Sequence, residues 1–270
     1  MSFIIEIASS DYATTAAAAK GGADRIELCA NLGEGGTTPS YGLIKQCRED
    51  FSLQLYPIIR PRGGDFLYSD EEYSIMLRDV QLCKQTGCDG LVSGLLNRDG
   101  SIDIKRTSAL IQAAYPLGFT FHRAFDRCFD PFEALEQLVE IGCERILTSG
   151  QRPVATEAAE MIARLNESAA QRIIIMPGSG IRKENIKMLA DTTGCVEFHS
   201  SLRSKITSAM DFIHPAFAGT EDYENNAIDE TAVKELLKQL DSATKPVRTP
   251  APPAAGQQPA AKKPARMSSR

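Results

Sequence analysis

The chain has 270 residues, of which 43% are apolar, and a formal net charge of -5. It contains no apolar run of the roughly 18 residues that a membrane span needs, so neither a membrane span nor a membrane partner is expected. Six of the 30 basic residues and none of the 35 acidic ones fall between Lys245 and Arg270, so the body of the chain carries a net charge of -11. That balance argues against nucleic acid as a partner, because nucleic-acid binding needs a basic surface.

The cysteines and the start of the chain indicate a reducing compartment. There are seven cysteines and no C-x-x-C pair, so neither a disulfide framework nor a zinc ribbon is expected. The stretch from Met1 to Ser10 has neither a basic start nor a long apolar run, so no secretory signal is expected. We therefore expect a cytoplasmic protein whose cysteines are free thiols.

Eight short apolar or β-branched runs alternate with amphipathic stretches. The predicted strands are Phe3–Ala8, Arg25–Cys29, Gln54–Arg60, Gly90–Leu95, Phe119–Arg123, Arg145–Ser149, Arg172–Pro177 and Val196–Ser200. The predicted helices are Tyr41–Arg48, Ser69–Thr86, Ile102–Tyr115, Pro131–Ile141, Thr156–Asn166 and Lys183–Thr192. This alternation predicts parallel βαβ units, and eight of them in one domain fit an α/β protein with a (β/α)8 TIM barrel. An open doubly wound sheet is the alternative, because periodicity does not show whether a sheet closes.

A weak internal repeat supports the barrel. Four predicted strands are entered through a glycine and a small residue, at Gly22, Gly87, Gly142 and Gly194. The glycine supplies the positive φ that ends a helix. A repeated βα unit would produce this recurrence of the same glycine-containing turn between each helix and the next strand.

The pattern changes after the eighth strand. Residues Ser204 to Asn226 are predicted to be an irregular connection, and Asp229–Leu240 is predicted to be a helix, which could be the eighth of the barrel. We expect one domain over residues 1–243. Residues 244–270 are rich in Pro, Ala and Lys without an apolar face, so a disordered basic tail is expected there, with a docking arm for an acidic partner as the alternative.

The second strand carries polar residues on the face that should point into the barrel. Side chains alternate along a strand, so Arg25, Glu27 and Cys29 share one face while Ile26 and Leu28 share the other. The apolar pair should face the helices, so the polar three should face the interior. The active face of a (β/α)8 barrel lies at the carboxyl ends of the strands, where such residues gather.

The same alternation points Glu6, Glu197 and His199 inward. Carboxylates inside a barrel are costly unless they pair with arginine or a metal. A closed ion network and a site for acid/base work both remain open. The candidates for acid/base chemistry are Glu6, Glu27, His122 and Asp126, and the sequence does not decide whether His122 or Arg123 faces the interior.

Two glycine-rich turns at the same end of the predicted barrel could bind an anion. Arginine forks bind carboxylate or phosphate, and glycine lets backbone N–H groups approach. The loops after the seventh and eighth strands of such barrels often bind phosphate. Tight turns with internal ion pairs are the alternative. The candidate anion-binding residues are Arg60, Arg62, Arg123, Ser149, Gly178, Ser179 and Gly180.

The cysteines divide by position. Five of them, at positions 47, 83, 88, 143 and 195, lie in helices or at strand starts, where packing is the expected role. Cys29 and Cys128 fall at the carboxyl ends of the strands. Cu(I) prefers soft thiolate ligands, so Cys29 and Cys128, helped by His199 or His122, form the candidate copper site.

Several stretches, in this order, resemble the CutC family: Arg25 to Cys29, Gly36 to Ser40, Ile59 to Phe66, Gly94 to Gly100, Phe121 to Asp126, Leu147 to Gly150, Met176 to Ile181 and Glu197 to His199. The resemblance covers about residues 3 to 215. It implies a cytoplasmic TIM barrel, a homo-oligomer, and a part in copper homeostasis through copper binding. Cys29 matches the cysteine of the family's second-strand motif.

Two functions therefore follow as hypotheses. The first is a copper-binding protein of copper homeostasis, with copper as cofactor and partner. The second is an enzyme that acts on a small anionic metabolite, phosphorylated or carboxylated, at the polar carboxyl face of the barrel.

Overall fold

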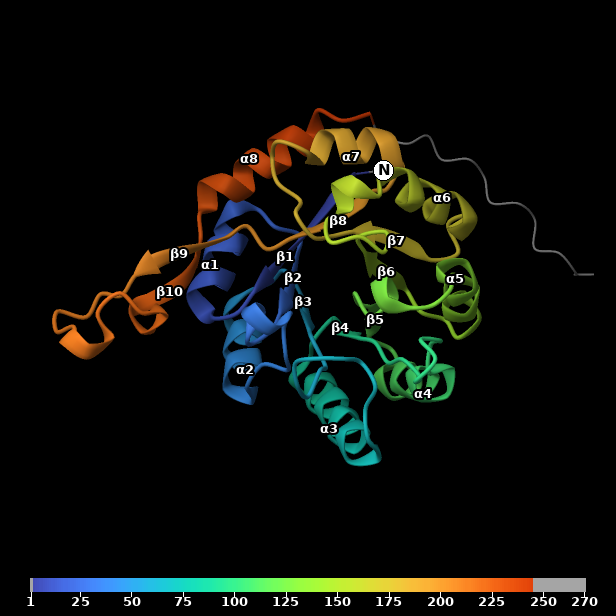
Figure 1. Ribbon diagram of the computed structural model, residues 1–270, viewed down its shortest axis with the longest axis horizontal. Helices are drawn as coiled ribbons and strands as arrows, with labels where there is room; N and C mark the ends of the chain where they lie inside the picture. The colour runs from blue at the N-terminus through green and yellow to red at the C-terminus, as the bar shows by residue number, and fades with distance from the viewer. Residues whose placement is uncertain (1, 245–270) are drawn as a thin grey trace, which may run out of the picture.

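Eight parallel strands alternate with eight helices around a central axis in the computed structural model, which describes residues 2–244 (Figure 1). The barrel strands are β1 (Ile4–Ser9), β2 (Arg25–Leu28), β3 (Gln54–Pro57), β4 (Gly90–Ser93), β5 (Gly118–Phe121), β6 (Arg145–Thr148), β7 (Ile174–Pro177) and β8 (Glu197–Ser200). The helices are α1 (Tyr12–Gly21), α2 (Tyr41–Asp50), α3 (Asp70–Thr86), α4 (Ile104–Ala114), α5 (Pro131–Glu140), α6 (Ala159–Ala169), α7 (Ile186–Thr193) and α8 (Glu230–Asp241).

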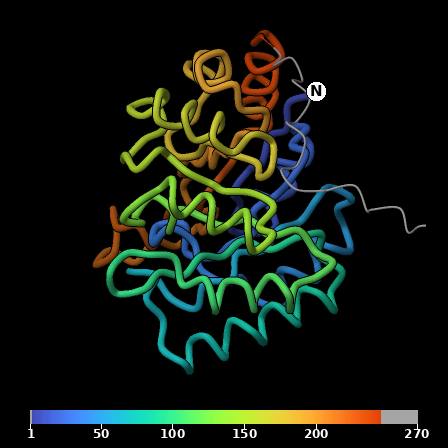
Figure 2. Tube along the Cα trace, turned by 90° about the vertical axis from the view of Figure 1, so that its right-hand side faces the viewer, coloured from blue at the N-terminus to red at the C-terminus, as the bar shows by residue number. Residues whose placement is uncertain are grey.

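The sheet closes into a barrel. One run of parallel strands has the order β3-β2-β1-β8 and the other has the order β4-β5-β6-β7. A parallel bridge between Ile58 and Val92 joins the runs on one side, and β7 contacts β8 on the other. Helix α8 packs against α1 and α7 and completes the outer ring, beside the amino-terminal segment (Figure 2). The predicted (β/α)8 barrel is confirmed, and the open doubly wound sheet is excluded.

Helix boundaries follow from local capping chemistry, as α3 illustrates. Ser69 accepts a hydrogen bond from the Glu72 N–H, and the Glu72 side chain accepts one from the Ser69 N–H, which satisfies two otherwise unpaired donors. The helix ends at Gly87, whose φ of 81° suits glycine.

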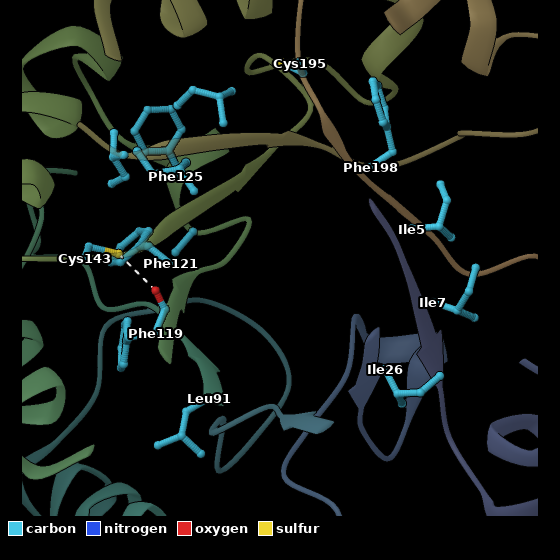
Figure 3. Close-up of a cluster of buried hydrophobic side chains, with 14 of the residues drawn as sticks. Ile5, Ile7, Ile26, Leu91, Phe119, Phe121, Phe125, Cys143, Cys195 and Phe198 are labelled. Carbon is cyan, nitrogen blue, oxygen red and sulfur yellow. Dashed lines mark hydrogen bonds between the residues drawn. The ribbon is translucent and has the colours of Figure 1, made fainter. Parts of the chain in front are cut away.

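The apolar core lies between the strands and the helices. Ile5, Ile7 and Phe198 are fully buried and point away from the barrel axis, as do Phe119 and Phe121 across the barrel (Figure 3). This layer explains why alternate strand positions are apolar. All seven cysteines are free and buried, and those at positions 143 and 195 belong to this layer, as expected of packing residues.

The barrel interior contains a paired ion network beside a small apolar cluster that includes Tyr56, Ile58 and Val92. Arg25 donates from Nε to Glu6 at 2.5 Å and from Nη2 to Glu197 at 2.6 Å. Arg145 donates from Nε to Glu197 at 2.6 Å, and the Tyr56 ring lies 5.1 Å from the Arg25 guanidinium. The expectation that Glu6 and Glu197 point inward is confirmed, and arginines balance both carboxylates.

One expectation about the chain path was wrong, and one helix was not predicted. The stretch from Ser204 to Asn226 is not irregular throughout, because β9 (Arg203–Thr207) and β10 (Glu224–Ile228) pair as an antiparallel hairpin that extends from the barrel (Figure 1). All five residues of β9 are exposed, so burial imposes no alternation on them. Helix α1 was not predicted, because its alanines form no apolar stripe.

The expected basic tail lies outside the described residues, apart from Thr244. Within residues 2–244, no helix is both long and apolar enough to cross a membrane.

Candidate functional site

A cavity of about 320 Å³ opens at the carboxyl ends of the barrel strands. Its wall combines titratable side chains, backbone from the loops after β7 and β8, and a few apolar side chains. The polar and backbone contributors are Glu27, Gly35, His122, Arg123, Ser179, Gly180, Arg182, His199, Ser200, Ser201 and Arg203. The apolar contributors are Ala8, Leu32, Ile58, Phe66, Leu147, Ile181 and Leu202.

Three adjacent strands bring Glu6, Glu27 and His199 together. In the parallel register Glu6 lies beside His199 on one side, while Glu27 on β2 lies beside Ala8, two residues farther along β1. The Nδ1 of His199 contacts Glu6 Oε1 at 2.7 Å, and its Nε2 lies 3.8 Å from Glu27 Oε2. Because the other Glu6 oxygen accepts from Arg25, Glu6 holds the imidazole in place and directs Nε2 toward Glu27.

The environment gives the two carboxyls opposite pKa shifts. Burial would raise the pKa of Glu6, but the Arg25 charge and the His199 hydrogen bond lower it to about 2. Burial raises the pKa of Glu27 to about 7, and nearby Glu6 adds to the rise while His199 opposes it. Burial would lower the pKa of His199, but the charges of Glu27 and Glu6 outweigh burial and raise it. Both groups of the Glu27–His199 pair therefore have raised pKa values, and their facing atoms lie 3.8 Å apart at the cavity wall, where general acid/base chemistry on a bound molecule would place them.

His122 is the fifth-strand residue that packs inward. Its ring is 4% exposed, lines the cavity and lies 4.9 Å from the Phe66 ring. Burial and the Arg60 charge lower the pKa of His122 to about 3. The neighbouring Arg123 also reaches the cavity wall, where it donates to Asp126 at 2.7 Å and to Ser149 Oγ at 2.8 Å.

Asp126 has a structural role in this geometry. Its carboxylate accepts from Thr148 Oγ1 at 2.5 Å, from the Ser149 N–H at 2.9 Å, from the Gln151 N–H at 3.2 Å and from Arg123 Nε at 2.7 Å. A carboxylate with this many donors has little free acceptor capacity. This arrangement does not favour acid/base work by Asp126, because the carboxylate fixes the loop after β6. Ser149 belongs to this arrangement and does not line the cavity.

The loop after β7 contributes residues with free backbone N–H groups to the cavity wall. Ser179 and Gly180 have φ angles of 77° and 73°, and both line the cavity with Ile181. Within the described part of the chain, the N–H groups of these three residues donate to no acceptor. Successive N–H groups in such a turn form a concavity suited to anions. Gly178, the residue before this turn, does not line the cavity. A Cβ added at Gly178 would lie 2.4 Å from the Leu147 side chain, so glycine is needed there for packing.

Arg60 and Arg62 are committed to the protein itself. Arg60 donates to the carbonyls of Glu34, Gly36 and Gly64 at 2.7 to 2.9 Å. Arg62 donates to Glu72 at 2.5 Å. Neither residue lines the cavity, so the structure does not favour anion binding by them there. They fold the glycine-rich turn after β3 onto neighbouring loops.

The expected copper ligands do not come together. In residues 2–244, Cys29, Cys128 and His199 do not form a group of neighbouring ligand atoms. Cys29 is fully buried, its thiol donates to the Ser9 carbonyl at 3.2 Å, and burial followed by the Glu27 charge raises its thiol pKa. Cys128 packs elsewhere, because the turn after β5 carries it to Gln151. These residues do not fit a multi-thiolate Cu(I) site, since Cu(I) prefers soft thiolates.

Glu6, Glu27 and His199 are the cluster in the described residues that could hold a metal ion, since their ligand atoms lie within 4.8 Å of one another. Carboxylate and imidazole suit harder ions than Cu(I). Both Glu6 oxygens already accept hydrogen bonds, so only His199 Nε2 and Glu27 could face an ion directly.

Arg182 and Phe66 are among the wall residues that were not predicted from the sequence. Arg182 follows the Gly-Ser-Gly turn directly, and Phe66 ends the Arg60 to Phe66 stretch. A signal existed for Arg182, because a cation next to an amide-rich turn favours anion binding. Nothing in the local pattern around Phe66 reports its contact with His122.

The fold and the site define a (β/α)8-barrel protein with a polar, titratable cavity at its carboxyl mouth. A model of the CutC family matches residues 3–204, so the chain belongs to the CutC family. A CutC family protein of Chromobacterium violaceum is 46% identical over 247 residues, which cover 90% of this chain and 100% of that protein. The human copper homeostasis protein cutC homolog is 43% identical over 239 residues, covering 87% of this chain and 88% of that protein.

Solved structures agree on the fold. The crystal structure of a CutC from Streptococcus agalactiae, titled as a copper homeostasis protein, superposes with a TM-score of 0.71 at 34% identity and covers 74% of this chain and 98% of its own. A phosphoribosylanthranilate isomerase of Thermotoga maritima superposes with a TM-score of 0.53 at 10% identity, covering 89% of this chain and 99% of its own, which shows the barrel fold alone.

Proposed function

We propose that this CutC-family barrel is an enzyme that binds a small anionic metabolite in its carboxyl-face cavity and moves a proton between that metabolite and the Glu27–His199 pair. The observation that carries the proposal is the 3.8 Å approach of His199 Nε2 to the buried Glu27 carboxylate, which within residues 2–244 forms no direct ion pair with an arginine. An unpaired buried carboxyl is costly for stability, and such groups concentrate where catalysis needs them.

The supporting framework is rigid. Glu6 accepts from His199 Nδ1 and from Arg25, so the imidazole cannot rotate without breaking a buried ion pair. An orienting carboxylate behind a histidine base is the arrangement that general acid/base catalysis uses. Glu6 is thus a positioning residue, and Glu27 and His199 are the groups that meet the substrate.

The anionic part of the metabolite would lie on the loop after β7. Ser179, Gly180 and Ile181 line the cavity and have N–H groups that donate to no acceptor in the described residues, and Arg123 and Arg182 line the same cavity. Oriented N–H groups and guanidinium groups together bind phosphate or carboxylate.

The first experiment is an amide NMR titration with inorganic phosphate and, separately, acetate. Binding should shift the amides of Ser179, Gly180 and Ile181, and an Arg182→Gln variant should bind more weakly. Arg172→Gln is the matched control, because Arg172 pairs with Glu136 on the outer surface. Unshifted Ser179 to Ile181 amides at tens of millimolar anion would count against the proposal.

A role in copper homeostasis is the second proposal, supported by the names of the human and streptococcal relatives. Its candidate ligand is Cys29, which directly follows β2 and lies two positions after Glu27. Cu(I) titration of reduced protein against a competing chelator, with Cys29→Ser and Cys128→Ser in parallel, tests it. Tight binding lost only in Cys29→Ser would support a copper site, and binding unchanged in both variants would remove these ligands.

A cytoplasmic location and a homo-oligomeric state complete the proposal. The free, buried cysteines favour a reducing compartment. Exposed apolar side chains on the β9–β10 arm, such as Ile206 and Phe212, favour association between copies. Fractionation of cells and light scattering of the full chain test the two points.

A further inference from the structure

His122 has a hydrogen-bonding arrangement that fixes which ring nitrogen carries its proton. The backbone N–H of Ala124 donates to His122 Nδ1 at 3.2 Å. A nitrogen that accepts from an N–H has no proton of its own, so in the neutral ring the proton is on Nε2. His122 is therefore a donor through Nε2.

That donor has no partner within the described residues. His122 Nε2 is one of the few buried side-chain polar atoms there without a hydrogen bond. The ring is 4% exposed and belongs to the cavity wall. Buried donors are nearly always satisfied, so an exception on a cavity wall points to an acceptor that arrives with a ligand.

The ring is held where it is. Phe66 packs on it at 4.9 Å, and an added Cβ at Gly94 would lie 2.5 Å from Nδ1, so only glycine leaves room for the imidazole. The charged groups near it are Arg60 and Arg127, and both disfavour a second proton, as burial does. His122 therefore stays a neutral donor.

The barrel places His122 across the cavity from the Glu27–His199 pair. In strand order β5 is four strands from β1, and Glu27 and His199 are on β2 and β8, which flank β1 (Figure 1). All three side chains line one cavity of about 320 Å³, which suits a molecule of metabolite size.

We propose that the metabolite carries a carbonyl group whose oxygen accepts a hydrogen bond from His122 Nε2, and that the Glu27–His199 pair removes a proton from the carbon next to that carbonyl. The C–H electron pair becomes the C=C bond of an enolate, and the carbonyl π electrons move to the oxygen facing His122. Return of the proton to the opposite face of that carbon, or to the oxygen, gives an isomer of the substrate, so no oxidant or second substrate is needed. This step rests on the proposed function for its base, and it adds the reaction class, the carbonyl substrate class and the electrophilic role of His122.

The test begins with imidazole ¹⁵N spectra. The chain has only three histidines, so His122→Gln, His199→Gln and His214→Gln variants assign them. His122 should be neutral with the proton on Nε2 across the range from about pH 5 to 8, where an ordinary histidine changes charge. A proton on Nδ1, or titration of His122 in this range, would overturn the inference.

The second part compares two probes that differ at one group. Dihydroxyacetone phosphate has a carbonyl, and glycerol 3-phosphate has a hydroxyl in its place. The carbonyl probe alone should shift the His122 Nε2–H signal and exchange its carbon-bound hydrogen for deuterium in D2O. A His122→Phe variant should lose about 10²- to 10³-fold of that exchange, the usual loss when one such donor is removed, and His122→Gln, which keeps a donor, should lose less.

The outcomes separate the two proposals. In one outcome both probes shift the Ser179 to Ile181 amides, both change the His122 Nε2–H signal equally, and neither exchanges carbon-bound hydrogen. That outcome supports the anion site and overturns the carbonyl chemistry. If neither probe shifts those amides, the proposed function fails and the inference fails with it.

Discussion

Replacing Glu27 by glutamine should stabilise the protein relative to wild type, and this gain in the free energy of unfolding should be larger at alkaline pH than at acidic pH. Burial raises the pKa of Glu27 from 4.5 to about 7, so the folded state holds the carboxyl proton more tightly than the unfolded chain does. Below its unfolded pKa the Glu27 carboxyl is protonated in both the folded and the unfolded state, so its ionisation does not change the free energy of unfolding. As the pH rises through the window from 4.5 to about 7, the folded state must carry a buried carboxylate and loses stability.

The magnitude follows from the shift. Each pKa unit corresponds to about 1.36 kcal/mol, so the loss reaches about 3 kcal/mol at alkaline pH. The Glu27→Gln substitution removes the ionisable group and keeps the size and shape of the side chain. His199 acts in the same direction, because its pKa is raised and the stability that it adds is lost as the pH rises through its folded pKa.

Urea unfolding of wild type and Glu27→Gln at a series of pH values measures the difference. The stability advantage of Glu27→Gln should grow with pH and level off in mildly alkaline solution. Glu49→Gln is the control, because Glu49 is exposed and forms only a distant pair with Lys45. Parallel curves for wild type and Glu27→Gln would refute the reasoning that Glu27 is an unneutralised buried carboxyl.

Three further outcomes follow from buried groups. Glu197→Gln should lower the free energy of unfolding, measured with urea, by about 3–5 kcal/mol, because it leaves Arg25 and Arg145 without a full set of carboxylate partners in the interior. A loss below about 1 kcal/mol would contradict the ion network. Gly94→Ala should destabilise by about 1–3 kcal/mol and change the His122 ring signals, since its Cβ would lie 2.5 Å from Nδ1, and an unchanged spectrum would show that this contact is absent. A thiol reagent should modify the native protein very slowly and should count seven thiols after unfolding, because every cysteine is buried, and fast native reaction would contradict that burial.

The strands and most helices could be predicted because local pattern determines them. Alternating or continuous apolar runs marked all eight barrel strands, and cap residues such as Ser69 marked helix starts. Helix α1 was missed because alanines fill it, and helix propensity with an Asp11 cap leaves no stripe to detect. The β9–β10 arm was missed because exposed strands lack alternation.

The candidate site was predictable only in part. Alternation placed Glu6, Glu27 and His199 inward, but their roles depend on the register of β8 beside β1, which joins residues 193 positions apart. Asp126 and Arg60 were assigned chemistry from residue type and from their place at the carboxyl end of a predicted strand. Their hydrogen-bond partners come from other loops, so only the folded chain shows that they are structural.

The most direct measurement of the proton-transfer pair is a ¹³C NMR titration of the glutamate side-chain carboxyls in wild type and Glu27→Gln. One carboxyl should titrate near pH 7 in wild type and be missing in the variant, while the Glu6 carboxyl stays ionised down to about pH 2. If every glutamate titrates below about pH 5, as ordinary carboxyls do, Glu27 is not a proton-transfer group and the proposed chemistry of this cavity is wrong.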